Sequence, residues 1–238
     1  MSNMGFIVGG YYLIQATETK GWINEKFFPP IIWSVSHHIC EIYPESWIFT
    51  WTSDDGSAKE RERNQEILNL DDDAFHALQL EFDDLFNQDK FGFPNVFLSL
   101  ALARNFCKRY LTHISNIKLL SIALADEYWE QFIQKTIPGK NMGEYAIRIK
   151  LRERGVVEPE AVFKGFEVLG YDHGQFCSYI CNSLQDDYSK KLGVSLNKNG
   201  FIENYDEARK AAEYTMSDEV KAEPYLWFPW LISEYSIV

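Results

Sequence analysis

Residues 165–182 read GFEVLGYDHGQFCSYICN, and residues 223–235 read EPYLWFPWLISEY. These two stretches hold the densest aromatic, cysteine and histidine content of the chain. Residues 162–169 are typical of a β-strand that turns at Gly170. Residues 174–192 predict a helix that ends at Gly193, because glycine is a common C-terminal cap residue. The region therefore predicts a strand, a turn and a helix in succession.

The tail predicts the last strand of a sheet, over residues 226–235. Pro229 should place at least part of this strand at an edge, because proline donates no hydrogen bond to a neighbouring strand. Trp227 and Trp230 are the largest side chains of the tail. Aromatic residues dominate both cores and protein interfaces, and we favour the core here.

The rest of the chain alternates between strand and helix patterns without a regular βαβ rhythm. Residues 117–124 fit either a strand or the start of a helix. These elements predict an α+β fold, with a mixed or antiparallel sheet packed against several helices. The further strands are expected at residues 4–16, 31–35 and 47–52, where glycines in the first suggest an edge or a close-packing site. The helices are expected at residues 57–70, 72–87, 95–110, 126–134 and 204–216.

Length and composition predict a folded protein with a sizeable core. The 238 residues are 46% hydrophobic and 16% aromatic, which lies far from the composition of disordered chains. A chain of this length fits one domain or two small ones. We expect a single domain over residues 1–238, with a possible soft subdivision near 138–143.

The formal net charge is −12, from 23 basic and 35 acidic residues. Such a surface repels phosphate groups, so we expect neither nucleic acid nor a membrane as a partner. It attracts a basic protein and accelerates the encounter with it.

Four cysteines and the absence of an apolar span or signal sequence predict a reduced, cytoplasmic protein. The sequence has no phosphate loop, dinucleotide fingerprint, nucleophile elbow or H-E-x-x-H motif. We predict no metal site and no cofactor.

An acidic run lies between residues 66 and 89, where no lysine or arginine occurs. It spans the predicted helix 72–87, whose apolar residues fall at helical spacing. The acids form either a solvated helix face or a surface that binds a partner. They are Glu66, Asp71, Asp72, Asp73, Glu81, Asp83, Asp84 and Asp89.

Residues 145–154 read YAIRIKLRER and alternate apolar and basic side chains. This pattern predicts an amphipathic strand with one basic face. The face could bind an anion, but we favour an internal match to the protein's own acids or the protection of a sheet edge. The basic residues are Arg148, Lys150, Arg152 and Arg154.

His173, Cys177 and Cys181 follow one another at intervals of four residues. On a helix they would share one face. A zinc ion would need a further ligand from a distant segment such as residues 37–40, and buried, inert cysteines are the simpler interpretation. A Cys177–His173 nucleophile pair is the alternative, although no signature of a cysteine hydrolase surrounds it.

Three segments together carry a resemblance to a known class of protein. They are GFEVLGYDHGQFCSYICN at residues 165–182, the pair LGV and NGF at residues 192–194 and 199–201, and AEPYLWFPWLISEY at residues 222–235. They resemble a C-terminal pattern in bacterial proteins that look like immunity proteins of polymorphic toxin systems. The resemblance covers roughly the last third of the chain.

This resemblance implies inhibition by binding, in which an acidic surface occludes a toxin domain that is often a basic nuclease. The acidic run is the candidate surface. Reversing Asp72, Asp83 and Asp84 to lysine should slow association in a salt-dependent way. The candidate partner-binding residues are Asp71, Asp72, Asp73, Glu81, Asp83 and Asp84.

Two other functions remain open. The chain could be a hydrolase or transferase that uses Cys177 with His173, which a thiol of unusually low pKa would favour. It could also be a non-catalytic subunit of a homo-oligomer, with Trp227 and Trp230 at its interface.

Overall fold

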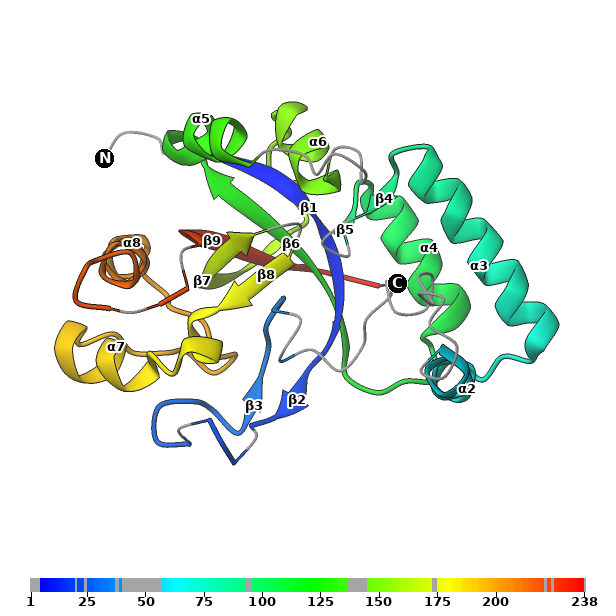
Figure 1. Cartoon of the computed structure of the whole chain (residues 1–238), viewed down its shortest axis with the longest axis horizontal. Helices are drawn as coiled ribbons and strands as arrows, with labels where there is room; N and C mark the ends of the chain where they lie inside the picture. Colours follow the sequence, from blue (N-terminus) through cyan, green and yellow to red (C-terminus); the bar gives the residue numbers. More distant parts are fainter. Residues whose placement is uncertain are drawn as a thin grey trace.

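One antiparallel sheet forms the centre of the protein, and helices cover both of its faces (Figure 1). The computed structural model describes residues 5–19, 21–23, 25–36, 39, 57–92, 96–136, 145–172, 175–220, 222–223 and 225–237. Within them the sheet has seven strands in the order β4-β5-β1-β6-β9-β7-β8. The predicted α+β class is confirmed, and the sheet is of the antiparallel type.

Four long strands make up the middle of the sheet: β1 (Phe6–Gln15), β6 (Ile117–Ala125), β9 (Leu226–Tyr235) and β7 (Val162–Asp172). The first two precede residues 138–143 and the last two follow them, so one sheet joins both sides of the possible subdivision. The flanking strands are β5 (Val96–Phe97), β4 (Phe91–Gly92) and β8 (Gln175–Ser178). A separate ribbon consists of β2 (Thr17–Glu18) and β3 (Ile31–Ile32).

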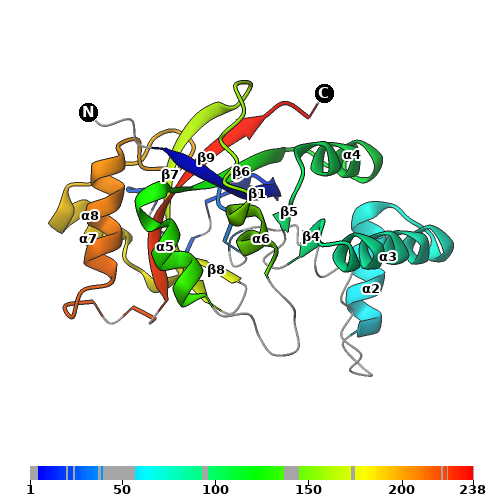
Figure 2. The same cartoon turned by 90° about the horizontal axis from the view of Figure 1, so that it is seen from above.

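Side chains alternate between the two faces of the sheet and meet different helices on each. One face packs against α5 (Asp126–Lys135) and α6 (Ala146–Arg152). The opposite face carries two helix groups at its two ends (Figures 1 and 2). These groups are α2 (Ser57–Leu68), α3 (Asp72–Asn87) and α4 (Leu100–Tyr110), and α7 (Gln185–Leu192) and α8 (Tyr205–Thr215).

The aromatic tail is core. Trp227 and Trp230 are 1% and 0% exposed and belong to the cores on opposite faces of the sheet. They are therefore not available as an interface between subunits. β9 lies in the middle of the sheet, yet residues 226–229 pair only with β7, because β6 pairs from Trp230 onward. The edge position predicted from Pro229 thus holds for that part of the strand.

The helix predicted over residues 174–192 is wrong. β7 continues to Asp172 and pairs there with Gln175 of β8. A 3-10 helix, η1 (Tyr179–Asn182), follows, and α7 begins only at Gln185. Gly170 does not mark a turn either. A Cβ at this position would lie 2.8 Å from the indole ring of Trp227, so its role is close packing within the strand.

The strand predicted over residues 145–154 is also wrong, because α6 occupies most of it. Ile147 and Leu151 are buried at a spacing of four, which suits a helix as well as the alternation suits a strand. Arg148 is only 5% exposed and donates to the carbonyl of Ile133 near the end of α5. The basic residues therefore form no common face, and Arg154, for example, pairs with Asp126.

Other boundaries agree to different degrees. α3 has the predicted limits, and residues 117–124 belong to a strand. α4 begins at Leu100, because residues 96–97 form β5 instead. The strand expected at residues 31–35 is confined to 31–32, and the one expected at 47–52 lies outside the described residues. Gly10 has φ 145°, and a Cβ there would lie 2.0 Å from Val96 Cγ1, which confirms close packing in place of an edge.

Candidate functional site

α3 presents the predicted acidic surface at one end of the molecule (Figure 1). Asp71 caps the helix by accepting a hydrogen bond of 2.9 Å from Ala74 N, and acids in the first turn suit the positive end of the helix dipole. The buried stripe faces α4 and the sheet, and the exposed residues of the helix face outward. The stripe consists of Phe75, Leu78 and Phe82.

Two of the predicted partner-binding acids contact basic side chains within the protein. Asp72 Oδ1 accepts hydrogen bonds from Arg61 at 3.3 Å and from Gln65 at 2.9 Å. Glu81 Oε1 lies 2.6 Å from Arg109 Nη1. Each of these carboxylates has a local counter-charge, so their contribution to an attractive surface is smaller than the sequence suggests.

Three of the predicted acids are exposed: Asp73, Asp83 and Asp84. Among the described residues, no lysine or arginine nitrogen lies within 4.0 Å of their carboxylate oxygens. Leu80 lies among them on the same helix face, three and four residues before the last two and seven after the first. Its side chain is 54% exposed. The outer face of α3 is therefore an apolar centre surrounded by uncompensated carboxylates.

Sequence reasoning missed Leu80, although the signal was present. At 3.6 residues per turn, a residue two positions after Leu78 lies on the opposite side of the helix. The buried stripe already accounted for the apolar side, so an additional leucine had to face solvent. A large apolar side chain on an otherwise acidic face is the kind of exposure that marks an interaction site.

A groove of about 730 Å³ runs between α2 and α3 beside this face. Its lining includes four acids, Glu62, Glu66, Asp71 and Asp72, but no lysine or arginine. Asn69, in the left-handed conformation with φ 53°, turns the chain between the two helices. The groove extends the negative surface from the helix face toward α2.

The cysteines that the sequence singled out do not share a helix face. Cys177 lies on β8 and Cys181 in η1, while His173 and the other proposed ligands at residues 37, 38 and 40 are outside the described residues. Across the described ranges, no group of three histidine, cysteine or acidic side chains is arranged to hold a metal.

The surroundings of Cys177 oppose a role as nucleophile. A hydrogen bond with Cys181 and then burial raise the pKa of the Cys177 thiol above its usual value, and the nearby Glu223 adds to the shift. The Sγ atom lies 3.7 Å from Glu223 Oε2. Catalytic cysteines need a lowered pKa from a neighbouring cation or a helix N-terminus. Burial also raises the pKa of Cys107, to about 11.

A buried carboxylate links β7 to the segment that follows β3. Glu167 is 3% exposed and accepts hydrogen bonds from Ser34 Oγ and from Val35 N, the latter at 3.2 Å. Burial raises the pKa of Glu167 to about 7, against the lowering effect of these hydrogen bonds and one with Ser178. The sequence offered no signal that distinguished this residue from the other acids.

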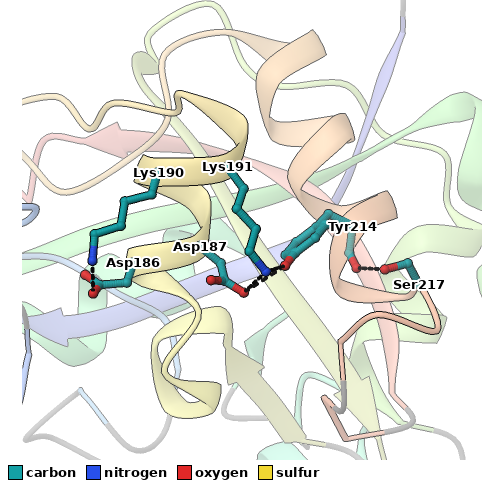
Figure 3. A network of polar contacts seen from close by, with 6 residues as sticks. All are labelled: Asp186, Asp187, Lys190, Lys191, Tyr214 and Ser217. Carbon is teal, nitrogen blue, oxygen red and sulfur yellow. Dashed lines mark hydrogen bonds and ion pairs between the residues drawn. The ribbon is translucent and has the colours of Figure 1, made fainter.

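The opposite end of the molecule carries a self-contained polar network on α7 and α8 (Figure 3). Lys190 lies 2.7 Å from Asp186. The Tyr214 hydroxyl donates to Asp187 at 2.7 Å and accepts from Lys191 at 2.7 Å. The hydrogen bonds from Tyr214 and Lys191 lower the pKa of the Asp187 carboxyl. Asp186 and Asp187 are partly exposed, and lysines balance their charge.

Comparisons of this chain with protein-family models, curated proteins and solved structures found no match. None of the helices in the described part of the chain has both the length and the apolar character that a membrane crossing requires.

Proposed function

We propose that the chain is an immunity-type binding protein that occludes a basic partner, such as a toxin domain, in the cytoplasm. The outer face of α3, from Asp73 to Asp84, is the proposed contact surface. The observation that carries the proposal is the exposure of Leu80 among three carboxylates without basic partners in the described residues.

The chemistry of this face suits a basic protein better than other ligands. Carboxylates around the rim attract and orient a positively charged surface, and their effect falls with added salt. An apolar side chain at the centre loses its water on contact, as the residues that dominate interface energy usually do. The formal charge of −12 supports the same choice of partner.

Binding is favoured over cysteine catalysis by the state of the thiols. The alternative hydrolase or transferase needs Cys177 as a thiolate, whereas the surroundings of this residue raise its pKa. The homo-oligomer alternative loses its proposed interface, because Trp227 and Trp230 lie in the core.

The test uses the purified chain and the C-terminal domain encoded by the gene immediately upstream of its own. The association rate is measured by surface-bound kinetics at about 50 mM and about 500 mM salt. A variant with Asp73→Lys, Asp83→Lys and Asp84→Lys should associate about tenfold or more slowly at the lower salt concentration, and the difference should shrink at the higher one. Asp73 replaces Asp72 in this variant, because Asp72 is already bonded to Arg61.

The matched control reverses the same number of charges at the other end of the molecule. Glu203, Asp218 and Glu219 are exposed and lie before and after α8, and their change to lysine should leave the association rate nearly unchanged. Equal slowing by both triple variants would mean that only net charge matters, and no slowing by the α3 variant would refute the proposed surface.

A further inference from the structure

The protein itself supplies a cation at the edge of the proposed contact surface. Arg61 of α2 reaches the carboxylate of Asp72 at the start of α3, with its Nη2 atom 3.3 Å from Asp72 Oδ1. Gln65, one turn further along α2, donates to the same oxygen at 2.9 Å. The contact is open to solvent, because the side chains of Asp72 and Arg61 are 83% and 42% exposed. An internal guanidinium thus occupies the acid that directly precedes the proposed surface.

This contact uses only one oxygen of the carboxylate. Both hydrogen bonds that Asp72 accepts from described side chains end on Oδ1. Glu81, further along α3, is held at both oxygens, since Oε1 accepts from Arg109 at 2.6 Å and Oε2 from Tyr110 at 3.2 Å. Arg109 also lies over the ring of Tyr110, 4.8 Å from its centroid. The contact of Arg61 is therefore the weaker of the two, and an incoming cation can displace it.

The helix that carries Arg61 is anchored independently of this contact. Leu68, the last residue of α2, is 2% exposed and belongs to the core that α3 and α4 share with the sheet. His113 Nε2 lies 2.8 Å from the carbonyl oxygen of Ile67 in the last turn. Arg61 can therefore leave Asp72 by rotation of its own side chain, while α2 keeps its position.

We propose that Arg61 is an autoinhibitory residue of the acidic face, which a basic side chain of the partner displaces from Asp72 on binding. This inference rests on the proposed function and adds a way in which the protein limits its own affinity. An arginine of the partner can bind both carboxylate oxygens, whereas Arg61 contacts one of them through a single nitrogen. A partner without a cation at this position leaves Arg61 in place and gains no contact with Asp72, so the arrangement selects for basic partners.

The test measures the dissociation rate of the complex with the upstream-encoded partner domain at about 50 mM salt, for a matched pair of variants. Arg61→Gln frees Asp72 and should slow dissociation by about two- to fivefold, the range that corresponds to an exposed ion pair. Arg63→Gln removes the same charge from an exposed position on the same helix, and should leave the dissociation rate within about 1.5-fold of the wild type. Glutamine is as good a helix former as arginine, so both variants should keep α2, which circular dichroism checks.

A second substitution shows whether Arg61 acts through Asp72. In an Asp72→Asn background, Arg61→Gln should change the dissociation rate by less than about 1.5-fold, because the partner has no carboxylate to gain there. The inference is overturned if Arg61→Gln dissociates no more slowly than Arg63→Gln, or if its effect persists in the Asp72→Asn background. Either result leaves the proposed surface intact. Unchanged association of the Asp73→Lys, Asp83→Lys and Asp84→Lys variant would overturn both the surface and this inference.

Discussion

The two ends of the molecule carry helices with paired acids, and only one end balances them. On α7, Asp186 and Asp187 each contact a lysine one turn later, at 2.7 and 3.1 Å. On α3, Asp83 and Asp84 are followed one turn later by uncharged amides. Asp83 and Asp84 are exposed and Asp186 and Asp187 are partly exposed. The pair on α7 is balanced by its own lysines (Figure 3), whereas the pair on α3 has no basic side chain within 4.0 Å among the described residues.

The grooves beside α7 and α3 differ in charge in the same way as the two helices. A groove of about 680 Å³ next to α7 includes two acids and two bases among its lining residues, Glu25, Lys26, Asp186 and Lys190. The groove between α2 and α3 includes four acids and no base among its lining residues, and of the four only Asp72 has a basic partner among the described residues, Arg61. The number of acids in a segment is therefore a poor guide to a binding surface, because what matters is whether the protein supplies the counter-charge itself.

The largest expected effect concerns what the two ends have in common, a buried aromatic anchor. Phe82 of α3 lies 5.0 Å from the ring of Phe91, and Tyr188 of α7 stacks on Tyr179 at 4.5 Å. Phe82→Ala and Tyr188→Ala should each lower the free energy of unfolding by about 3–5 kcal/mol, because both leave a large cavity. Urea unfolding measures this. A loss below about 1 kcal/mol at one end would mean that this end is not an integral part of the core.

The second prediction concerns partner binding, which should depend on the α3 end of the molecule and not on the α8 end. Leu80→Ala should weaken partner binding by about 2 kcal/mol through faster dissociation, because it removes the apolar centre of the proposed surface. It should change stability by less than about 0.5 kcal/mol, because the residue is exposed. Met216, 45% exposed at the end of α8, is the matched control, and Met216→Ala should leave binding unchanged. Equal effects of both variants on dissociation would remove the distinction between the ends.

A third effect concerns Glu167, an acid that neither end exposes. Its pKa in the folded state, about 7, lies above the ordinary value of 4.5, so the folded protein retains a proton that the unfolded chain has lost. The free energy of unfolding should then fall as the pH rises from about 4.5 to about 7. Relative to Glu167→Gln, the wild type should lose roughly 2–3 kcal/mol across this range. Parallel pH profiles of the two proteins in urea unfolding would contradict the buried, protonated state.

The smallest effect is expected on α7. Asp187→Asn removes an exposed ion pair and should lower stability by less than about 1 kcal/mol. Since the pKa of Asp187 is lowered, the small contribution should disappear as the pH falls through the folded-state pKa. Thermal unfolding at neutral and acidic pH measures this, and partner association should not change. Slower association would show that the neutral end also takes part in binding.

The sequence predicted the long elements well because their signals are redundant. α3 has a cap at Asp71, two acids in its first turn and an apolar stripe, and its limits were predicted correctly. The helices predicted at residues 204–216 and 126–134 were identified for similar reasons and correspond to α8 and α5. In each case several local preferences indicate the same helix, and the tertiary contacts of the folded protein agree with that local preference.

The predictions for short segments were wrong where the apolar residues fit both the helical and the strand period. In residues 145–154, Ile147 and Leu151 satisfy both a strand and a helix, and the contact of Arg148 with the end of α5 is a tertiary feature. At Gly170 the need for glycine comes from Trp227, more than fifty residues away in the sequence. The acidic run was predicted to lie on a helix over residues 72–87, and it does. Only the structure separates the acids that have internal partners from those that do not.

The place of β9 in the sheet has a consequence for how the protein is made. β9 lies between β6 and β7, yet it follows both of them in the sequence. Until it is synthesised, those two long apolar strands have no common neighbour and each presents an open edge to other chains. The nascent protein therefore cannot complete its native sheet until residues 226–235 have been synthesised, and until then these edges are open to pairing with other chains.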